Sequence, residues 1–259
     1  MNAPSPREVE QVVEFKLNGA DVVAQSGETI IEVADRLGVP IPRLCYKPGM
    51  RADGNCRSCM VEIKGERVLA PSCCRQPVKG MEVTSDSPRA LHSQKLIVEL
   101  LASDMPDKVY KLDSELEFWK NALHIGKPRF ERRAQPRQDL SHPAMAVNLD
   151  ACIQCTRCVR ACREVQVNDV IGYAFRGADS AIVFDENDPM GESTCVGCGE
   201  CVQACPTGAL APAHEAYLVP TQKIVASVCP YCGVGCQINY HISDNKIVRV
   251  EGRDGIANH

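Results

Sequence analysis

The chain has 259 residues, enough for two or three small domains, and its hydrophobic fraction of 44% is ordinary for a globular protein. The formal net charge of −4 gives no strong positive field, which argues against nucleic acid as the main partner. No run of eighteen or more apolar residues is present, so we expect no membrane span. The first ten residues show no basic stretch followed by an apolar one, and we expect no secretory signal.

The 16 cysteines are the most informative feature of the chain. They fall into four groups whose members mostly lie two or three residues apart, a spacing that suits metal ligation better than disulfide bonds. Secreted proteins with this much cysteine are usually small and disulfide-linked. Free thiolates and oxygen-sensitive metal clusters indicate the cytoplasm, and we expect a cytoplasmic location.

Residues 11–88 are expected to form the first domain. Two strands at 12–17 and 22–23 are joined by an Asn18-Gly19 hairpin turn, and a helix follows over 30–37. After a cysteine loop, strands are predicted at 60–63, 68–69 and 81–83. A ββα start with a cysteine loop after the helix is the layout of a β-grasp ferredoxin.

The cysteines of this first domain do not have the spacing of plant ferredoxins, which have four residues in the first gap. The group consists of Cys45, Cys56, Cys59 and either Cys73 or Cys74. Residues 42–45, 54–62 and 74–81 resemble the [2Fe–2S] domain of the large iron–sulfur subunit of respiratory complex I, and of its relatives in NAD-linked hydrogenases and formate dehydrogenases. The resemblance implies one [2Fe–2S] cluster, and the register of residues 77–81 favours Cys74 as its fourth ligand.

Residues 89–145 are expected to be a helical and basic linker. Apolar residues recur at helical spacing over 91–101 and 112–123, which predicts two helices. Five Lys and Arg residues follow between 127 and 137, either docking a partner subunit or forming a solvated or cluster-facing charge run. The complex I family holds a further cluster in this region with one histidine and three cysteines. Those cysteines are absent around residues 103–106.

Residues 146–217 carry a duplicated C-x2-C-x2-C-x3-C motif, with an offset of 43 residues. In bacterial two-cluster ferredoxins the fourth cysteine of each run ligates the other cluster. This predicts one [4Fe–4S] cluster on Cys152, Cys155, Cys158 and Cys205, and a second on Cys195, Cys198, Cys201 and Cys162. The alternative, a pair of structural zinc sites, does not have this spacing. The insertion at residues 164–194 is expected to form a strand pair over the first cluster.

Residues 222–259 predict a strand at 223–228, a cysteine loop, and strands at 237–241 and 246–250. Cys229, Cys232 and Cys236 read C-x2-C-x3-C, and the phrase around them resembles the N-terminal [4Fe–4S] domain of molybdenum or tungsten bis-pterin oxidoreductases, formate dehydrogenases in particular. The family's fourth cysteine would lie past His259. We expect a third [4Fe–4S] cluster if a fourth ligand is supplied, and otherwise a damaged cluster, an open-corner cluster or an empty loop.

The sequence thus predicts an α+β protein: a β-grasp [2Fe–2S] domain, a short linker, a two-[4Fe–4S] ferredoxin-like domain and the start of a bis-pterin oxidoreductase domain. As a whole it resembles the N-terminal part of the catalytic subunit of cytoplasmic NAD-linked formate dehydrogenase. The resemblance implies an electron relay between a molybdenum or tungsten bis-pterin guanine dinucleotide site, beyond the chain end, and a flavin/NAD diaphorase (beta) subunit.

No catalytic residue is expected in this part of the enzyme. The chain has no G-x-G-x-x-G and no Walker motif, so a nicotinamide reaction needs a partner subunit. Two alternatives remain open. One is the diaphorase small subunit of an NAD-linked hydrogenase, and the other is a stand-alone ferredoxin-like electron carrier.

Overall fold

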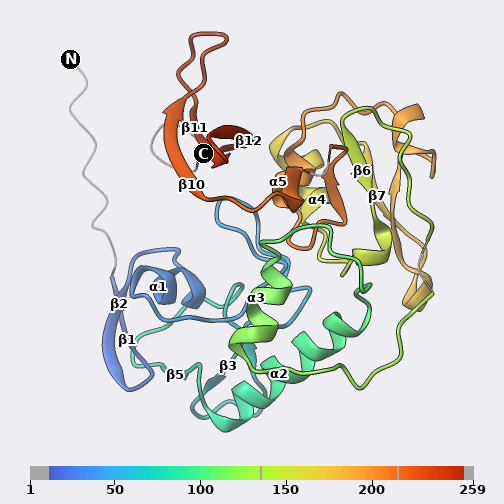
Figure 1. Ribbon diagram of the computed structural model, residues 1–259. Coiled ribbons are helices and arrows are strands. Elements are labelled where there is room, and N and C mark those ends of the chain that lie inside the picture. Colours follow the sequence, from blue (N-terminus) through green and yellow to red (C-terminus); the bar gives the residue numbers. More distant parts are fainter. Residues whose placement is uncertain (1–11, 135, 215, 254–259) are drawn as a thin grey trace, which may run out of the picture. The chain divides into compact units, whose positions relative to one another are not determined.

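The computed structural model describes residues 12–134, 136–214 and 216–253 (Figure 1). These residues divide into two compact units. The first lies within Met1–Tyr46 and Ala52–Val98, and the second within Lys47–Arg51 and Glu99–His259.

The first unit is built on a five-stranded sheet in the order β2-β1-β5-β3-β4. β1 is antiparallel to β2 and parallel to β5, and β3 is antiparallel to both β5 and β4. The strands are β1 (Val13–Leu17), β2 (Ala20–Ala24), β3 (Met60–Ile63), β4 (Ala70–Pro71) and β5 (Glu82–Thr84). With α1 (Ile30–Arg36) this is the predicted β-grasp arrangement, although β4 lies two residues after its predicted position.

Local sequence explains the start of this unit. Asn18 and Gly19 both have positive φ, 51° and 82°, as the tight turn between β1 and β2 requires. Thr29 then begins α1 through a capping box, in which its backbone N–H and its hydroxyl both donate to the Glu32 carboxylate, at 2.7 and 2.8 Å. The apolar face of α1 is buried in the core, as predicted.

The helix α2 (Pro88–Ser103) is present where a helix was predicted, but its buried face differs from the predicted leucine stripe. Leu96 and Leu100 are exposed, whereas Ala90, Gln94, Val98 and Ala102 are buried. These four recur every fourth residue and so share one face of the helix. The Gln94 amide donates to the Met60 and Ser85 carbonyls at 2.9 and 3.0 Å, which satisfies a polar group that would otherwise be costly to bury.

The second unit contains short elements around a cysteine-rich core. Its helices are α3 (Glu115–Ala122), α4 (Arg157–Arg160), which continues as a π-helical turn over Ala161–Val165, and α5 (Glu200–Ala204). Two strand pairs accompany them: β6 (Met145–Val147) with β9 (Leu210–Pro212), and β7 (Ile171–Ala174) with β8 (Ala181–Phe184). Four 3-10 turns lie at Leu149–Ala151, Gly177–Asp179, Met190–Glu192 and Ala216–Leu218.

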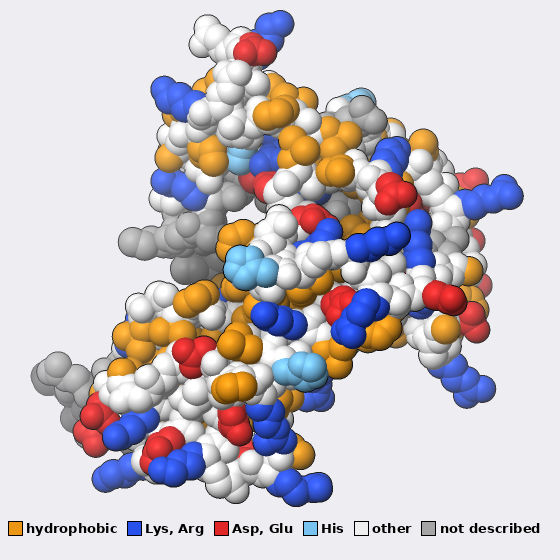
Figure 2. All heavy atoms as spheres, turned by 60° about the horizontal axis from the view of Figure 1, so that its bottom comes forward, with side chains coloured by type: hydrophobic (Ala, Val, Ile, Leu, Met, Phe, Trp, Pro, Cys, Tyr) orange, Lys and Arg blue, Asp and Glu red, His pale blue; other side chains and the backbone are white. Residues whose placement is uncertain are grey.

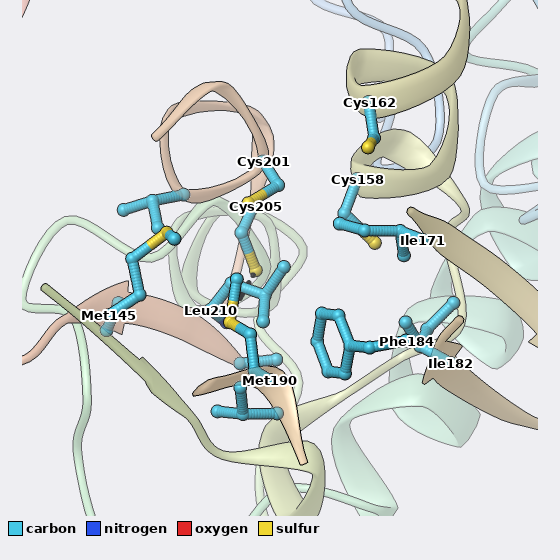
Figure 3. Packing of buried hydrophobic residues seen from close by; sticks show 14 of the residues in the cluster. Met145, Cys158, Cys162, Ile171, Ile182, Phe184, Met190, Cys201, Cys205 and Leu210 are labelled. Carbon is cyan, nitrogen blue, oxygen red and sulfur yellow. Dashed lines mark hydrogen bonds between the residues drawn. The ribbon is translucent and has the colours of Figure 1, made fainter. Parts of the chain in front are cut away.

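Four cysteine side chains are part of the hydrophobic core of this unit. Cys158 and Cys162 come from α4 and the turn that follows it, and Cys201 and Cys205 from α5 and its end (Figure 3). They belong to the same buried cluster as Leu210, Met190 and Phe184. The two halves of the duplicated motif therefore fold around one shared interior.

The last part of the second unit is a three-stranded antiparallel sheet in the order β10-β11-β12, formed by β10 (Lys223–Val228), β11 (Gln237–Ser243) and β12 (Lys246–Gly252). All three strands were predicted. The described helices include none that is both long and apolar enough to cross a membrane. On the face drawn in Figure 2, Lys and Arg side chains are interspersed with Asp and Glu.

Candidate metal centres

In the loop that carries the first cysteine group, backbone N–H groups donate hydrogen bonds to sulfur atoms of the same loop. The Cys45 N–H donates to the Cys56 Sγ and the Cys56 N–H donates to the Cys45 Sγ, both at 3.4 Å. The Ser58 hydroxyl lies 3.1 Å from the Cys56 Sγ. Gly54 and Arg57 both have a φ of 60°, which turns the backbone sharply on either side of Cys56. N–H···S contacts of this kind offset negative charge on sulfur.

Cys73, not Cys74, lies with the other thiols of this group. Cys73 is fully buried, and its thiol hydrogen-bonds with those of Cys45 and Cys59. These bonds raise the pKa of Cys73 far above its usual value, and the bond with Cys73 lowers the pKa of Cys59 to about 7. The pKa of Cys45 is lowered mainly by its hydrogen bond with Cys56 and then by that with Cys73. Cys74 is exposed, although its Sγ is 3.6 Å from that of Cys73. The geometry is therefore at odds with the expectation of Cys74.

The position of residue 73 follows from the strand before it. Ser72 is bound twice to the Cys59 carbonyl, through its N–H at 3.1 Å and its hydroxyl at 2.9 Å. This fixes the register next to β3 and turns the following side chain, Cys73, toward Cys59. The motif over residues 77–81 favours Cys74, because its register is taken from the residues that follow the cysteines. That register does not reflect the pairing of Ser72 with Cys59.

The first predicted cubane set lines one cavity. Four cysteines from both halves of the repeat meet there, together with apolar residues that include Leu149, Ile182 and Leu210; the cysteines are Cys152, Cys155, Cys158 and Cys205. Burial raises the pKa of Cys152 to about 11 and that of Cys155 to about 12. A largely apolar cavity that disfavours bare thiolates suits a bound cationic iron core, since thiolates are the ligands of iron–sulfur clusters.

The second predicted set brings Cys162 to the other half of the repeat. Cys162 and Cys201 belong to the same buried cluster. Burial raises the pKa of Cys201 well above its usual value. The Val170 N–H donates to the Cys162 Sγ and the Gly197 N–H to the Cys195 Sγ, each at 3.4 Å. Cys198 is exposed, so this set has one ligand position open to solvent.

The cysteine loops of the two halves of the repeat have the same backbone conformation but different residues at the positions with positive φ. Gly197 and Gly199 have φ values of 70° and 78°, and the equivalent Gln154 and Thr156 have 56° and 60°. A left-handed conformation costs roughly 1–2 kcal/mol for a residue with a Cβ but almost nothing for glycine. The first loop therefore stores strain that the second avoids.

The insertion between the two runs supports that strained loop. The Gln154 side chain accepts from the Tyr173 hydroxyl at 3.1 Å and donates to the Ser180 carbonyl. Tyr173 lies on β7, and Ile182 on β8 lines the cavity of the first cubane set. The strand pair expected in this insertion is present as β7 and β8.

The last cysteine group lies on a loop between β10 and β11. The Cys229 N–H donates to the Cys236 carbonyl at 2.8 Å and closes the loop. Gly233 and Gly235 have φ values of 78° and 85°. Cys232 and Cys236 are exposed.

Within the described ranges, no three His, Cys, Asp or Glu side chains converge on the position of a single metal ion. Thiolates around one zinc ion each lie at about 2.3 Å from it. Those of a cubane bind separate irons at different corners of a larger body.

The basic arm is largely tied to its own unit. Arg129 pairs with Glu99 at 2.7 Å and Arg133 pairs with Asp104 at 2.6 Å. Burial raises the pKa of Cys152, and the charge of Arg133 opposes that rise. These contacts favour a charge run that faces the cluster sites, at least in part, over a free docking arm.

Sequence reasoning missed two buried cations near the first cubane set. Arg157 and Arg160 on α4 are each 2% exposed. The available signal was their position inside the duplicated motif, between consecutive ligand cysteines.

Three protein families match the chain in succession. Residues 10–88 match the 2Fe-2S iron-sulfur cluster binding domain, residues 142–211 the ferredoxin-like domain of NADH-quinone oxidoreductase subunit 3, and residues 222–259 the Fe4S4 domain of molybdopterin oxidoreductases. The matches agree with the predicted order of modules and with the α+β fold.

Similar proteins extend well beyond this chain. This chain is 30% identical to a subunit of NADH-quinone oxidoreductase from Rhizobium meliloti, and the match covers 92% of this chain. It is 24% identical to a putative formate dehydrogenase of Staphylococcus haemolyticus, and that match covers 93% of this chain. The chain spans 29% of the length of each of these relatives.

A solved structure has the same fold. It is a chain in the crystal structure of an NAD+-reducing [NiFe]-hydrogenase in the H2-reduced state, with a TM-score of 0.75 and 26% identity. The match covers 82% of this chain and 92% of the hydrogenase chain. Together the three modules and these relatives show that the chain belongs to the family of N-terminal iron–sulfur regions that NADH-quinone oxidoreductases share with molybdopterin oxidoreductases.

Proposed function

We propose that this chain is the iron–sulfur electron relay of an NAD-linked formate dehydrogenase. Electrons would pass between a molybdenum or tungsten bis-pterin formate/CO2 site, in a further part of a longer protein, and a flavin/NAD diaphorase subunit. The observation that carries the proposal is the module order: a molybdopterin-type Fe4S4 domain follows a [2Fe–2S] domain and a two-cubane domain in one chain. The similarity to a putative formate dehydrogenase over 93% of the chain supports it.

The proposed ligand sets follow the geometry. The [2Fe–2S] cluster would be held by Cys45, Cys56, Cys59 and Cys73, with Cys73 in place of Cys74. The two cubane sets would be those predicted, and Cys229, Cys232 and Cys236 would supply three ligands of a further cluster. We take 11–88, 89–145, 146–217 and 222–259 as the module boundaries, and we propose a cytoplasmic location.

Iron–sulfur clusters, when bound, accept and release single electrons over a wide range of potentials. The chain's own residues set the conditions for this. Apolar side chains such as Ile182 and Leu210 line the cavity of the first cubane set. Backbone N–H groups directed at Cys162, Cys195 and Cys205 at 3.4–3.5 Å stabilise negative charge on the sulfurs.

A second candidate is the diaphorase part of an NAD-linked hydrogenase. It is favoured by the solved hydrogenase chain, of which 92% is covered. That match leaves about a fifth of this chain unmatched, whereas residues 222–259 match a molybdopterin oxidoreductase domain. A stand-alone electron carrier is a third candidate and has no observation in its favour beyond the clusters themselves.

The test uses the native complex, isolated anaerobically through a tagged copy of this chain. Formate or hydrogen is added as the sole reductant, and the clusters are followed by low-temperature EPR, with NAD+ reduction measured in parallel. The proposal predicts cluster reduction and NADH formation with formate and none with hydrogen. Reduction by hydrogen alone would support the hydrogenase assignment. No response to either reductant, in clusters that dithionite reduces, would contradict both.

A further inference from the structure

The duplicated motif has diverged in charge at equivalent positions of its two helices. With the 43-residue offset, Arg157 corresponds to Glu200 and Arg160 to Gln203. The adjacent residues are identical in the two halves, since Val159 and Ala161 match Val202 and Ala204. The change from two arginines to a glutamate and a glutamine is therefore confined to the polar positions of α4 and α5.

We propose that this divergence gives the two cubane sites different reduction potentials. The charge of Arg157 raises the reduction potential of the first site, formed by Cys152, Cys155, Cys158 and Cys205. A single electron shared by the pair would then rest at this first site. The inference rests on the proposed function only in that both sites hold [4Fe–4S] clusters.

Burial makes the charge of Arg157 effective. The residue is 2% exposed and lies between two ligand cysteines on α4, so water screens its charge poorly. Arg157 lies two residues after Cys155 and directly before Cys158, and both cysteines line the cavity of the first set. A cluster gains one negative charge when it is reduced, and a nearby cation favours that state.

Two further cations donate to backbone carbonyls of the first ligand set. The Arg160 guanidinium is equally buried and donates to the Cys155 carbonyl at 3.3 Å. The Lys111 ammonium donates to the Cys205 carbonyl at 3.3 Å.

Glu115 opposes this effect only in part. Its carboxylate forms a two-point ion pair with Arg157, at 2.6 and 2.8 Å, but its side chain is 40% exposed. Water therefore screens the charge of the Glu115 carboxylate more than that of the Arg157 guanidinium.

The second site has no comparable cation among the described residues of its own helix α5. Glu200 occupies the position of Arg157, is half-buried, and has the opposite charge. Arg163 follows Cys162 directly, but it is exposed and paired with Asp169 at 2.6 Å. The second cluster should therefore be the harder of the two to reduce.

The experiment is an EPR-monitored redox titration of the anaerobically purified chain with its clusters in place. The wild type should show two separate one-electron cubane steps, with spin–spin broadening only after the second. In Arg157→Gln, the higher step should move to more negative potential by at least 59 mV, a tenfold fall in the ratio of reduced to oxidised cluster at the wild-type midpoint. The lower step should move less.

Matched variants separate charge from structure. Arg157→Lys should restore most of the higher midpoint, because it keeps the charge while losing the two-point geometry. Glu115→Gln should move the higher step to more positive potential, and Glu200→Gln should do so for the lower step. Cubanes that titrate together in the wild type, or equal movement of both steps in Arg157→Gln with no recovery in Arg157→Lys, would overturn the inference. Absence of iron from the wild type would overturn the proposed function instead.

Discussion

The buried thiol of Cys73 hydrogen-bonds with the thiol of Cys45, while the adjacent Cys74 is exposed. A shift of one residue along the chain therefore decides whether the sulfur of Cys73 or that of Cys74 completes the first ligand set. Ser72, bound to the Cys59 carbonyl at 2.9 Å, fixes that register.

Substitution of the two neighbouring cysteines should give opposite results. Cys73→Ser should lose the [2Fe–2S] signal, because the buried position then lacks a thiolate ligand. Cys74→Ser should keep it, because its exposed side chain is not part of the set. The measurement is EPR of the reduced protein together with iron content. A cluster that survives Cys73→Ser and disappears in Cys74→Ser would restore the assignment made from the motif alone.

The crossed arrangement of the duplicated motif gives a second prediction. Cys205 lines the cavity with Cys152, Cys155 and Cys158, although it ends the second run of cysteines. Cys205→Ser should therefore alter the cubane whose potential depends on Arg157, and Cys162→Ser should alter the other one. Redox titration of each variant shows which step changes. The reverse assignment would mean that each run binds its own cluster.

Ligand grouping and module order could be predicted from the sequence because cluster ligands follow local spacing. The strands and helices of the first domain were predicted because hairpin and capping signals are also local: Asn18-Gly19 and the Thr29–Glu32 capping box are examples. The buried face of α2 was not predicted, because it depends on Gln94 reaching the carbonyls of Met60 and Ser85.

The placement of Cys73 and the charges at the first cubane site were not predicted for a related reason. Both depend on contacts between segments far apart in the chain. Arg157 looks like an ordinary helix residue until Glu115 on α3 is placed beside it at 2.6 Å. The motif fixes the sulfur positions but not what surrounds them.

Close backbone packing next to Cys195 gives a third prediction. A Cβ on Gly191 would lie 2.4 Å from the Ser141 carbonyl oxygen, a backbone atom that cannot move alone. Gly191→Ala should destabilise the protein by about 1–3 kcal/mol through overpacking. Thermal loss of the visible cluster absorbance measures the effect.

Gly126→Ala is the matched control, because no heavy atom lies within 4 Å of the added Cβ and φ is not positive. It should be neutral or slightly stabilising. Equal melting temperatures for the two variants would show that the segment around Ser141 moves without cost.

Tyr110 should make the stability fall at alkaline pH. Burial and the hydrogen bond that it donates to Asp150, at 2.9 Å, raise its pKa to about 12. An unfolded tyrosine ionises near pH 10, at about its reference value. Between these values the unfolded state loses a proton that the folded state keeps, so stability is retained below pH 10 and decreases toward pH 12.

Tyr110→Phe removes this group and should flatten the pH dependence. The measurement is the melting temperature of both proteins from pH 9 to 11, with tyrosinate absorbance followed in parallel. The same slope of melting temperature against pH in the wild type and in Tyr110→Phe, with Tyr110 ionising near pH 10, would contradict the hydrogen bond from Tyr110 to Asp150.

The central claim is that these cysteines bind iron–sulfur clusters that carry electrons. Its most direct test is iron, acid-labile sulfide and zinc content of the anaerobically purified chain, with low-temperature EPR after reduction. The account predicts about ten irons per chain, as two, four and four, with signals of both cluster types, and about thirteen or fourteen if the last cysteine group also fills. Fewer than about six irons with zinc in their place, and no EPR signal on reduction, would contradict it.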